Sequence, residues 1–410
     1  MLHTFRCLCL LLQSLTPEVI EHAQAGAAEQ QQGHFDVAIQ EFRKVTELQP
    51  NSASGYANLG NAYFQKGDYG AAIPELQHAL QLNPKLTGTH EALGVALLLQ
   101  GDAAGALPHL EETRSPELLG LAYLETGKLG GAIAALKAAL EKQPSDPDLL
   151  YYFGRATARA GAGTFAQLVK MNPELARKKE AAGNSEQHTL KDVGSLQAAL
   201  AKQPNDPDLL FDFHRAAEVA SKEAFNRILE SNAGSARAHQ VMAERWVEAG
   251  RLPDAVKEYA ESLRLRPYTA GVHLALGDVL ADEGNWPAAI AQYRIETSLR
   301  PADAEASYSL GTALLQQRQA SESLSELGRA DRLAPNKPAI LLALGQAAFA
   351  AKDNARAEQA WRKVLELDEK SGLAARAHRG LAELYRNTGN AAEADREQAA
   401  YQKLKTQGEH

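Results

Sequence analysis

The sequence is poor in the residues that carry covalent chemistry. Its 410 residues contain two cysteines, Cys7 and Cys9, and both lie within the first ten positions. The remainder of the chain therefore offers no disulfide framework and no thiol-based zinc site. No apolar run approaches the roughly 20 residues that a helix needs to cross a bilayer. The sequence therefore predicts no membrane-spanning segment.

The motifs of nucleotide-binding and hydrolytic enzymes are also missing. The sequence has no phosphate-binding loop ending in Gly-Lys-Ser/Thr and no Gly-x-Ser-x-Gly turn around a nucleophilic serine. Gly161 and Gly163 form a lone glycine pair at an expected helix junction, which favours a turn over a nucleotide site. Carboxylates are plentiful but are spread along solvent faces. We therefore expect no catalytic residue, no cofactor and no enzymatic activity.

A basic surface is a third absence. The formal net charge is -8, and the isoelectric point is about 5.9. Nucleic acids and anionic membranes bind to basic footprints. Neither is expected as the main partner of this chain.

The chain does contain a repeat of about 34 residues, a period typical of stacked helical arrays. In one copy its positions are Tyr56, Leu59, Gly60, Tyr63, Gly67, Tyr69, Ala72, Leu76, Ala79 and Pro84. In a later copy they are His273, Leu276, Gly277, Leu280, Gly284, Trp286, Ala289, Tyr293 and Pro301. A unit of this length buries its apolar face only by stacking on copies of itself.

Each copy is expected to contain two helices. Between residues 53 and 66, apolar residues recur every three or four positions, which is the buried stripe of a first helix. Gly67 can adopt the left-handed backbone that ends this helix. A second helix is expected over 69–82, because Pro84 prevents its continuation. Gly60 is small where the two helices must approach closely.

These residues resemble the tetratricopeptide repeat family, and the resemblance extends over nearly the whole chain. The copies keep phase, since Pro267, Pro301 and Pro335 are 34 residues apart. The small residue of the first helix recurs at Gly60, Gly94, Gly277, Gly311 and Gly345. The resemblance implies an all-α fold, an α-solenoid in which about eleven antiparallel helix pairs form a right-handed superhelix.

The middle of the chain departs from this spacing. Residues 136–177 match residues 196–237 without a gap, which indicates a duplicated double unit. Units shortened by about eight residues, or about two helical turns, are expected near 87–112, 147–172 and 207–235. The polar segment 173–203 is the expected hinge. The predicted organisation is a signal peptide or apolar cap at 1–15, an N-terminal repeat block at 16–146, degenerate or shortened repeats with a hinge at 147–235, a C-terminal repeat block at 236–374, and a last helix pair with a polar capping helix at 375–410.

The first fifteen residues are compatible with two cellular locations of the protein. Arg6 precedes the apolar run 7–12, as in a short secretory signal. A small-x-small cleavage site at 23–25 falls inside the expected first helix, which Thr16 would cap and Pro17 would open. The chain is therefore either exported, to the periplasm or the outside of the cell, or it stays in the cytoplasm with an apolar cap on the array.

Histidine is the remaining candidate for a metal ligand. Five of the twelve histidines occupy the repeat position of Tyr56, where a large ring packs against a neighbouring helix: His22, His90, His239, His273 and His378. A metal site needs ligands that converge on one point, and the spacings His-x3-His and His-Glu-x2-His do not occur in the sequence. We expect packing rings and no metal.

The resemblance places partner binding on the inner surface, which is lined by first-helix residues beside the core stripe. On the N-terminal side these are Asn58, Asn61, Gln65, Leu98 and Leu121. On the C-terminal side they are Glu244, Glu248, Asp278, Asp282, Glu305 and Gln316. The groove is expected to be apolar near one end and acidic near the other. Alternatively, the tighter packing of a shortened repeat buries Leu98 and Leu121.

The sequence thus favours a non-enzymatic scaffold for protein–protein interaction. Its partner would be a peptide segment or helix of another protein, with basic residues near the binding motif. The alternative is a recognition or regulatory subunit of an enzyme complex, for example in glycan or cell-envelope assembly.

Overall fold

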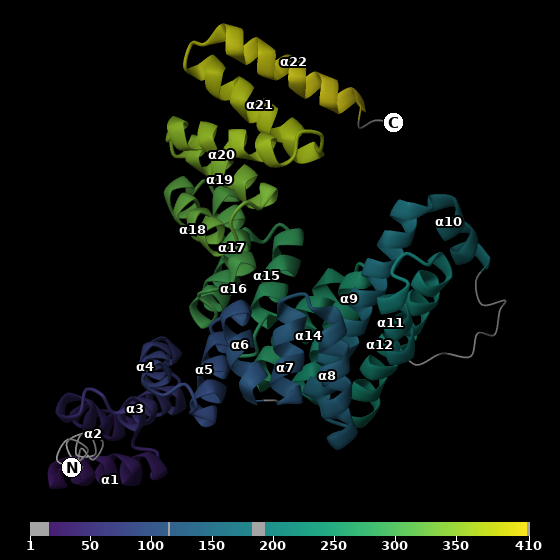
Figure 1. Cartoon of the computed structure of the whole chain (residues 1–410). Helices are drawn as coiled ribbons and strands as arrows, with labels where there is room; N and C mark the ends of the chain where they lie inside the picture. The colour runs from purple at the N-terminus through teal and green to yellow at the C-terminus, as the bar shows by residue number, and fades with distance from the viewer. Residues whose placement is uncertain (1–15, 114, 183–192, 408–410) are drawn as a thin grey trace, which may run out of the picture. The chain divides into compact units, whose positions relative to one another are not determined.

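The computed structural model describes residues 16–113, 115–182 and 193–407. Within these ranges the chain forms α-helices, numbered α1 to α22, and no strand (Figure 1). The all-α fold is therefore confirmed. The predicted signal or apolar cap at 1–15 and the central part of the predicted hinge, 183–192, lie outside the described residues.

The chain divides into two compact units, Met1–Ala224 and Phe225–His410. The helices of unit 1 are α1 (Pro17–Gln31), α2 (Phe35–Leu48), α3 (Ala53–Lys66), α4 (Tyr69–Leu82), α5 (Thr87–Leu99), α6 (Ala103–Thr113), α7 (Pro116–Glu125), α8 (Leu129–Lys142), α9 (Pro147–Met171), α10 (Pro173–Ala182) and α11 (Val193–Lys202), and α12 (Pro207–Ser231) crosses the division. The helices of unit 2 are α13 (Ala236–Glu248), α14 (Leu252–Leu265), α15 (Val272–Asp282), α16 (Trp286–Leu299), α17 (Ala304–Gln316), α18 (Ala320–Leu333), α19 (Pro338–Ala350), α20 (Asn354–Leu367), α21 (Gly372–Asn387) and α22 (Ala391–Gln407).

Most of these helices form hairpin pairs. The pairs are α1–α2, α3–α4, α5–α6 and α7–α8 in unit 1, and α13–α14, α15–α16, α17–α18, α19–α20 and α21–α22 in unit 2. Each second helix also packs against the first helix of the following pair. In unit 2 the pairs follow one another as a stack from α15 to α22 (Figure 1).

The turn inside a pair shows why the chain reverses there. α3 ends at Gly67, whose φ of 85° lies in the left-handed region that glycine enters without steric cost. Asp68 then caps α4, because its Oδ1 accepts a hydrogen bond of 3.1 Å from the N–H of Ala71. At the start of the array, α1 begins as predicted, with Thr16 as N-cap and Pro17 in the first turn.

Close packing within a pair depends on a missing side chain. In seven pairs, a glycine of the first helix faces the residue 16 positions later on the second helix, and a Cβ added to the glycine would lie 2.4–2.8 Å from that side chain. The contacts are Gly26–Phe42, Gly60–Leu76, Gly94–Leu110, Gly120–Leu136, Gly277–Tyr293, Gly311–Leu327 and Gly345–Trp361. The small residue predicted in the first helix is therefore what lets the two helices approach.

The middle of the chain differs from the expected two-helix units. Residues 87–112 do form a pair, α5 and α6, but α9 and α12 are single helices of 25 residues. The predicted junction at Gly161 is wrong, because this residue stays helical and packs against Ala217 of α12, where an added Cβ would lie 2.9 Å away. The first helices α3 and α5 are each followed by a glycine with a left-handed backbone, Gly67 and Gly101. No residue of α9 adopts this conformation, and the helix runs on without a turn.

Candidate functional site: the first-helix face

The first helices of several successive pairs pack against each other. They contact one another between α3 and α5 in unit 1, and between α15, α17, α19 and α21 in unit 2. Contacts of this extent between successive second helices do not occur in the described part of the chain. The stack from α15 to α22 therefore bends toward its first helices, and their solvent side is the inner one. We call the solvent side of α15, α17, α19 and α21 the first-helix face of unit 2.

In unit 1 the predicted site residues are of two kinds. Asn58 and Gln65 of α3 are exposed, and Asn61 is half-buried. Leu98 of α5 is only 8% exposed and belongs to the core that α4 to α7 share, against which Leu121 of α7 packs half-buried. Leu98 is thus buried, which agrees with the alternative of tighter packing in a shortened repeat.

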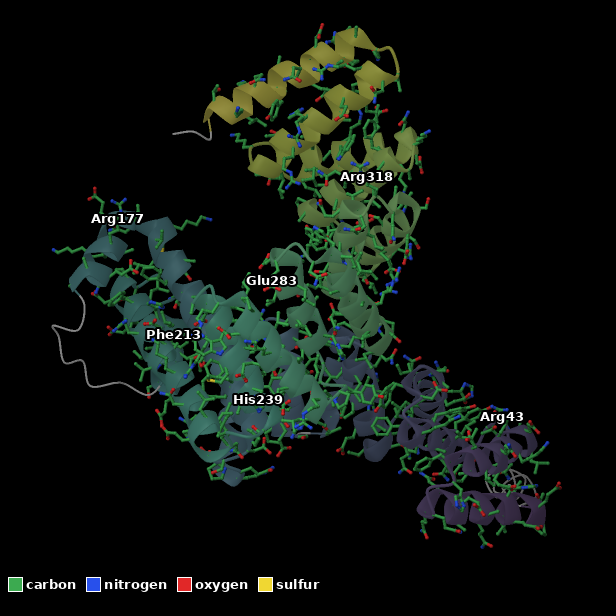
Figure 2. The ribbon with its side chains drawn as sticks, turned by 180° about the vertical axis from the view of Figure 1, so that it is seen from behind. Arg43, Arg177, Phe213, His239, Glu283 and Arg318 are labelled. Carbon is green, nitrogen blue, oxygen red and sulfur yellow. The ribbon has the colours of Figure 1, made fainter. Side chains whose placement is uncertain are left out.

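In unit 2 the predicted residues lie on three successive first helices. His239, Glu283 and Arg318 mark the start of α13 and the ends of α15 and α17 in Figure 2. Glu244 and Glu248 belong to α13, Asp278 and Asp282 to α15, and Glu305 and Gln316 to α17. Glu244 is half-buried and accepts a hydrogen bond of 3.3 Å from the Gln240 side chain; the other five are exposed.

Three of these acids act on one another across two helices. Asp278 keeps access to solvent, but its pKa is raised to about 6, mainly because the protein atoms around it partly desolvate its carboxylate. The negative charges of Glu305, from α17, and of Asp282, one turn along α15, contribute to this rise. We call Asp278, Asp282 and Glu305 the acidic cluster. The repeat phase had predicted their common face.

Tyr293 of α16 reaches the acidic cluster from inside the pair. Its ring is only 3% exposed and crosses Gly277, where an added Cβ would lie 2.5 Å from it. Its hydroxyl donates a hydrogen bond of 2.8 Å to Asp278 Oδ1, which opposes the rise of the Asp278 pKa. Desolvation and the charge of Asp278 raise the pKa of Tyr293. In the sequence Tyr293 is only one position of the repeat, and this polar contact was not predicted.

The five histidines also have a polar role that the sequence analysis missed. Each Nδ1 lies within hydrogen-bond distance of the residue 19 positions later on the second helix. The pairs are His22–Glu41 at 2.6 Å, His90–His109 at 2.9 Å, His239–Glu258 at 2.7 Å, His273–Gln292 at 2.8 Å and His378–Glu397 at 2.5 Å. No three or more His, Cys, Asp or Glu side chains converge as a metal site within the described ranges.

Among the residues that the structure describes, no helix is both long enough and apolar enough to cross a membrane.

Repeat-family models match more than half of the chain. A model described as TPR repeat matches residues 26–67, 60–101 and 120–161, and one described as tetratricopeptide repeat matches 274–338 and 342–407. With its helix pairs and its glycine contacts, the chain belongs to the tetratricopeptide repeat family. Repeats of this family generally form non-catalytic scaffolds for protein interaction, and that general class of function is supported for this chain.

Several solved structures are similar to parts of this chain at low sequence identity. MamA from Desulfovibrio magneticus is 21% identical, with 42% of this chain and 96% of that chain covered and a TM-score of 0.40. YrrB, described as a TPR protein with an unusual peptide-binding site, is 20% identical, with 44% and 92% covered and a TM-score of 0.40. PilF from Pseudomonas aeruginosa is 17% identical, with 52% and 99% covered and a TM-score of 0.39. No match is found among curated proteins.

Proposed function

We propose that this chain is a non-enzymatic scaffold that binds an extended segment of a partner protein along the first-helix face of unit 2. The partner segment carries Lys or Arg side chains, which lie against the acidic cluster. The observation that carries this proposal is the effect of Glu305 and Asp282 on the pKa of Asp278. Acids from two neighbouring first helices are close enough to act as one negative site.

The physics of the site favours a cationic ligand. Like charges gathered on an inward-curving surface focus a negative potential and attract basic segments. The charges also repel one another: after desolvation, which is the main cause, Glu305 and Asp282 add to the rise in the pKa of Asp278. A Lys or Arg side chain placed among them would relieve this repulsion. The same ligand would be attracted more weakly at high salt, because the Debye length is about 8 Å at physiological ionic strength.

The test is a selection from a random peptide library displayed on phage, followed by affinity measurements. Wild-type full-length protein should enrich peptides with Lys or Arg, and the affinity of the best peptide should fall as salt rises. The variant Asp278→Asn, Asp282→Asn, Glu305→Gln keeps the shape of the face and removes three charges. We expect it to lose at least about tenfold in affinity, or about 1.4 kcal/mol.

The matched control removes three exposed acids that lie away from the first helices, with the changes Glu322→Gln, Glu369→Gln and Asp395→Asn. It has the same net charge as the test variant. If both variants lose affinity equally, the effect is one of overall charge and the acidic cluster is not the site. Enriched peptides without basic residues would also contradict the proposal.

A further inference from the structure

The α5–α6 pair of unit 1 contains two histidines that face each other. Nδ1 of His90 lies 2.9 Å from Nδ1 of His109, and Nε2 of His90 lies 3.0 Å from the carbonyl oxygen of Pro84. Since a carbonyl only accepts, Nε2 of His90 carries a proton. When both rings are neutral, Nδ1 of His90 is therefore the acceptor and Nδ1 of His109 is the donor.

Protonation upsets this arrangement in two steps. A first proton can be accommodated, because His90 then donates through Nδ1 and His109 accepts after a change of tautomer. A second proton places two N–H groups against each other and two positive charges side by side. Burial lowers the pKa of His109, and the charge of His90 lowers it further. The structure at neutral pH thus favours an uncharged His109.

In other helix pairs, the histidine at the repeat position of His90 faces a different kind of side chain. Three of the other first-helix histidines face a carboxylate, in the pairs His22–Glu41, His239–Glu258 and His378–Glu397. A protonated imidazole can form an ion pair with a carboxylate, so protonation brings no like charges together in these three contacts. Only the pair on α5 and α6 combines two imidazoles among the five first-helix histidines named above.

No nearby carboxylate compensates for the charge. In the described part of the chain, neither His90 nor His109 forms an ion pair. The titratable groups of the two helices and of the elements packed against them are Glu91 on α5, Glu111 and Glu112 on α6, Tyr56, Tyr63 and Lys66 on α3, Tyr69, Glu75 and His78 on α4, and Glu117, Tyr123 and Glu125 on α7. Several have other partners: Glu75 interacts with His78 and Arg43, Glu111 accepts a hydrogen bond from Tyr123, and Glu117 accepts from Ser115 and Gln143.

We propose that the His90–His109 pair is an acid-operated switch that loosens α5 from α6 while the histidine–carboxylate pairs hold their own helices together. The sign follows from the proton balance. His109 is harder to protonate in the closed pair than in an open one, so the stability present at neutral pH is lost as the pH falls through the ordinary range of histidine. Opening would expose Leu97, Leu107 and Leu110, which are buried between the two helices and their neighbours.

The experiment is amide hydrogen exchange of the full-length protein at about pH 7.5 and pH 5.0, read by mass spectrometry. Rates are expressed as protection factors, which removes the pH dependence of chemical exchange. We expect protection of α5 and α6 to fall about tenfold at the lower pH, the effect of one pKa unit between closed and open forms. Protection of α13 and α14, which carry the His239–Glu258 pair, should stay or rise.

Two reciprocal variants make the assignment specific. His109→Glu gives α5–α6 the partner that the other pairs have, so its acid-induced loss should disappear. Glu258→His places two imidazoles in α13–α14, which should then lose protection in acid. Equal behaviour of the two pairs in the wild type would overturn the switch, and so would an acid-induced loss that persists in His109→Glu. If His109→Glu does not fold, an acid-resistant α13–α14 pair in Glu258→His would overturn it.

Discussion

The hydroxyl of Tyr293 donates a hydrogen bond of 2.8 Å to Asp278, so a buried ring of the second helix reaches an exposed acid of the first. The ring crosses the helix at Gly277, which has no side chain to block it. In the next two pairs, Leu327 and Trp361 occupy the place of Tyr293 and fill the same gap. Tyr293 therefore fixes the position of one member of the acidic cluster from within the core.

Removing this hydrogen bond should make Asp278 easier to protonate. A hydrogen bond to the ionised form of a carboxyl lowers its pKa. We therefore expect Tyr293→Phe to raise the pKa of Asp278 above its value of about 6. NMR titration of the carboxyl carbon, with Asp368 as an internal reference, measures the change. An unchanged or lower pKa would mean that Tyr293 does not hold this carboxylate.

The charge of Asp278 should also lower the stability of unit 2 at neutral pH. The folded-state pKa is raised from 3.8 to about 6, so the favourable contribution is present below the unfolded value and is lost as the pH rises through about 6. Asp278→Asn should therefore raise the unfolding midpoint at pH 7.5. Because the carboxylate is exposed, the gain should be about 1 kcal/mol or less.

Thermal unfolding of the wild type and of Asp278→Asn at several pH values tests this expected gain in stability. The gain from Asp278→Asn should shrink toward pH 4, where the wild-type carboxyl is protonated. Asp395→Asn, at an exposed position of α22, is the control and should not change the unfolding midpoint at any of these pH values. A variant that is less stable than wild type at pH 7.5 would contradict the desolvation of Asp278.

The glycine contacts predict that the effect of Gly311→Ala on stability depends on the side chain of Leu327. A Cβ on Gly311 would lie 2.6 Å from Cγ of Leu327, so Gly311→Ala should cost about 1–3 kcal/mol through overpacking. In a Leu327→Ala background the contact with the side chain is absent and only the backbone nitrogen of Leu327, 3.2 Å from the added Cβ, remains close. The same change should therefore cost clearly less than in the wild type, because the gain in helix propensity, up to about 1 kcal/mol, offsets the remaining strain. Urea unfolding of the four proteins measures both effects. Additive changes would show that the two residues do not limit helix approach.

Backbone strain in unit 2 can be relieved at Arg318. This residue has a φ of 59° in the turn between α17 and α18, where the two preceding pairs have Gly250 and Gly284, with φ of 70° and 77°. A left-handed backbone costs a side-chain-bearing residue roughly 1–2 kcal/mol. Arg318→Gly should therefore stabilise, by about 1 kcal/mol or less because glycine gains freedom in the unfolded chain. The reciprocal Gly284→Arg should destabilise; denaturant midpoints that move in the opposite directions would refute the strain.

The period of the sequence was sufficient to predict most of the fold. Because Gly60 and Gly94 are 34 residues apart, as are Gly277 and Gly311, the helix pairs of both blocks, their turns and the glycine contacts could be read from it. α9 and α12 were not predicted as single helices, because Gly161, which favours a turn in the sequence, stays helical in the structure, where it packs against Ala217. The phase of the repeat gives the place of a residue within its unit, but it does not show whether a helix is interrupted there.

The acidic cluster was predictable for the same reason, because its members sit at fixed places of successive first helices. Tyr293 was not, since its polar contact depends on the direction of the ring inside the pair. For Leu98 the sequence left open whether the side chain lines the groove or is buried, because the spacing of the repeats does not decide which neighbours pack against it. What the sequence missed therefore lies in contacts between helices.

The claim that the first-helix face of unit 2 holds a basic segment is tested most directly by photo-crosslinking. A peptide from the library selection would carry a photoreactive residue beside its Lys or Arg, and the adducts on full-length protein would be mapped by mass spectrometry. The account predicts adducts on α15 and α17, within Val272–Asp282 and Ala304–Gln316, and their loss in the Asp278→Asn, Asp282→Asn, Glu305→Gln variant. Adducts on the second helices α16 and α18, or on unit 1, would contradict it.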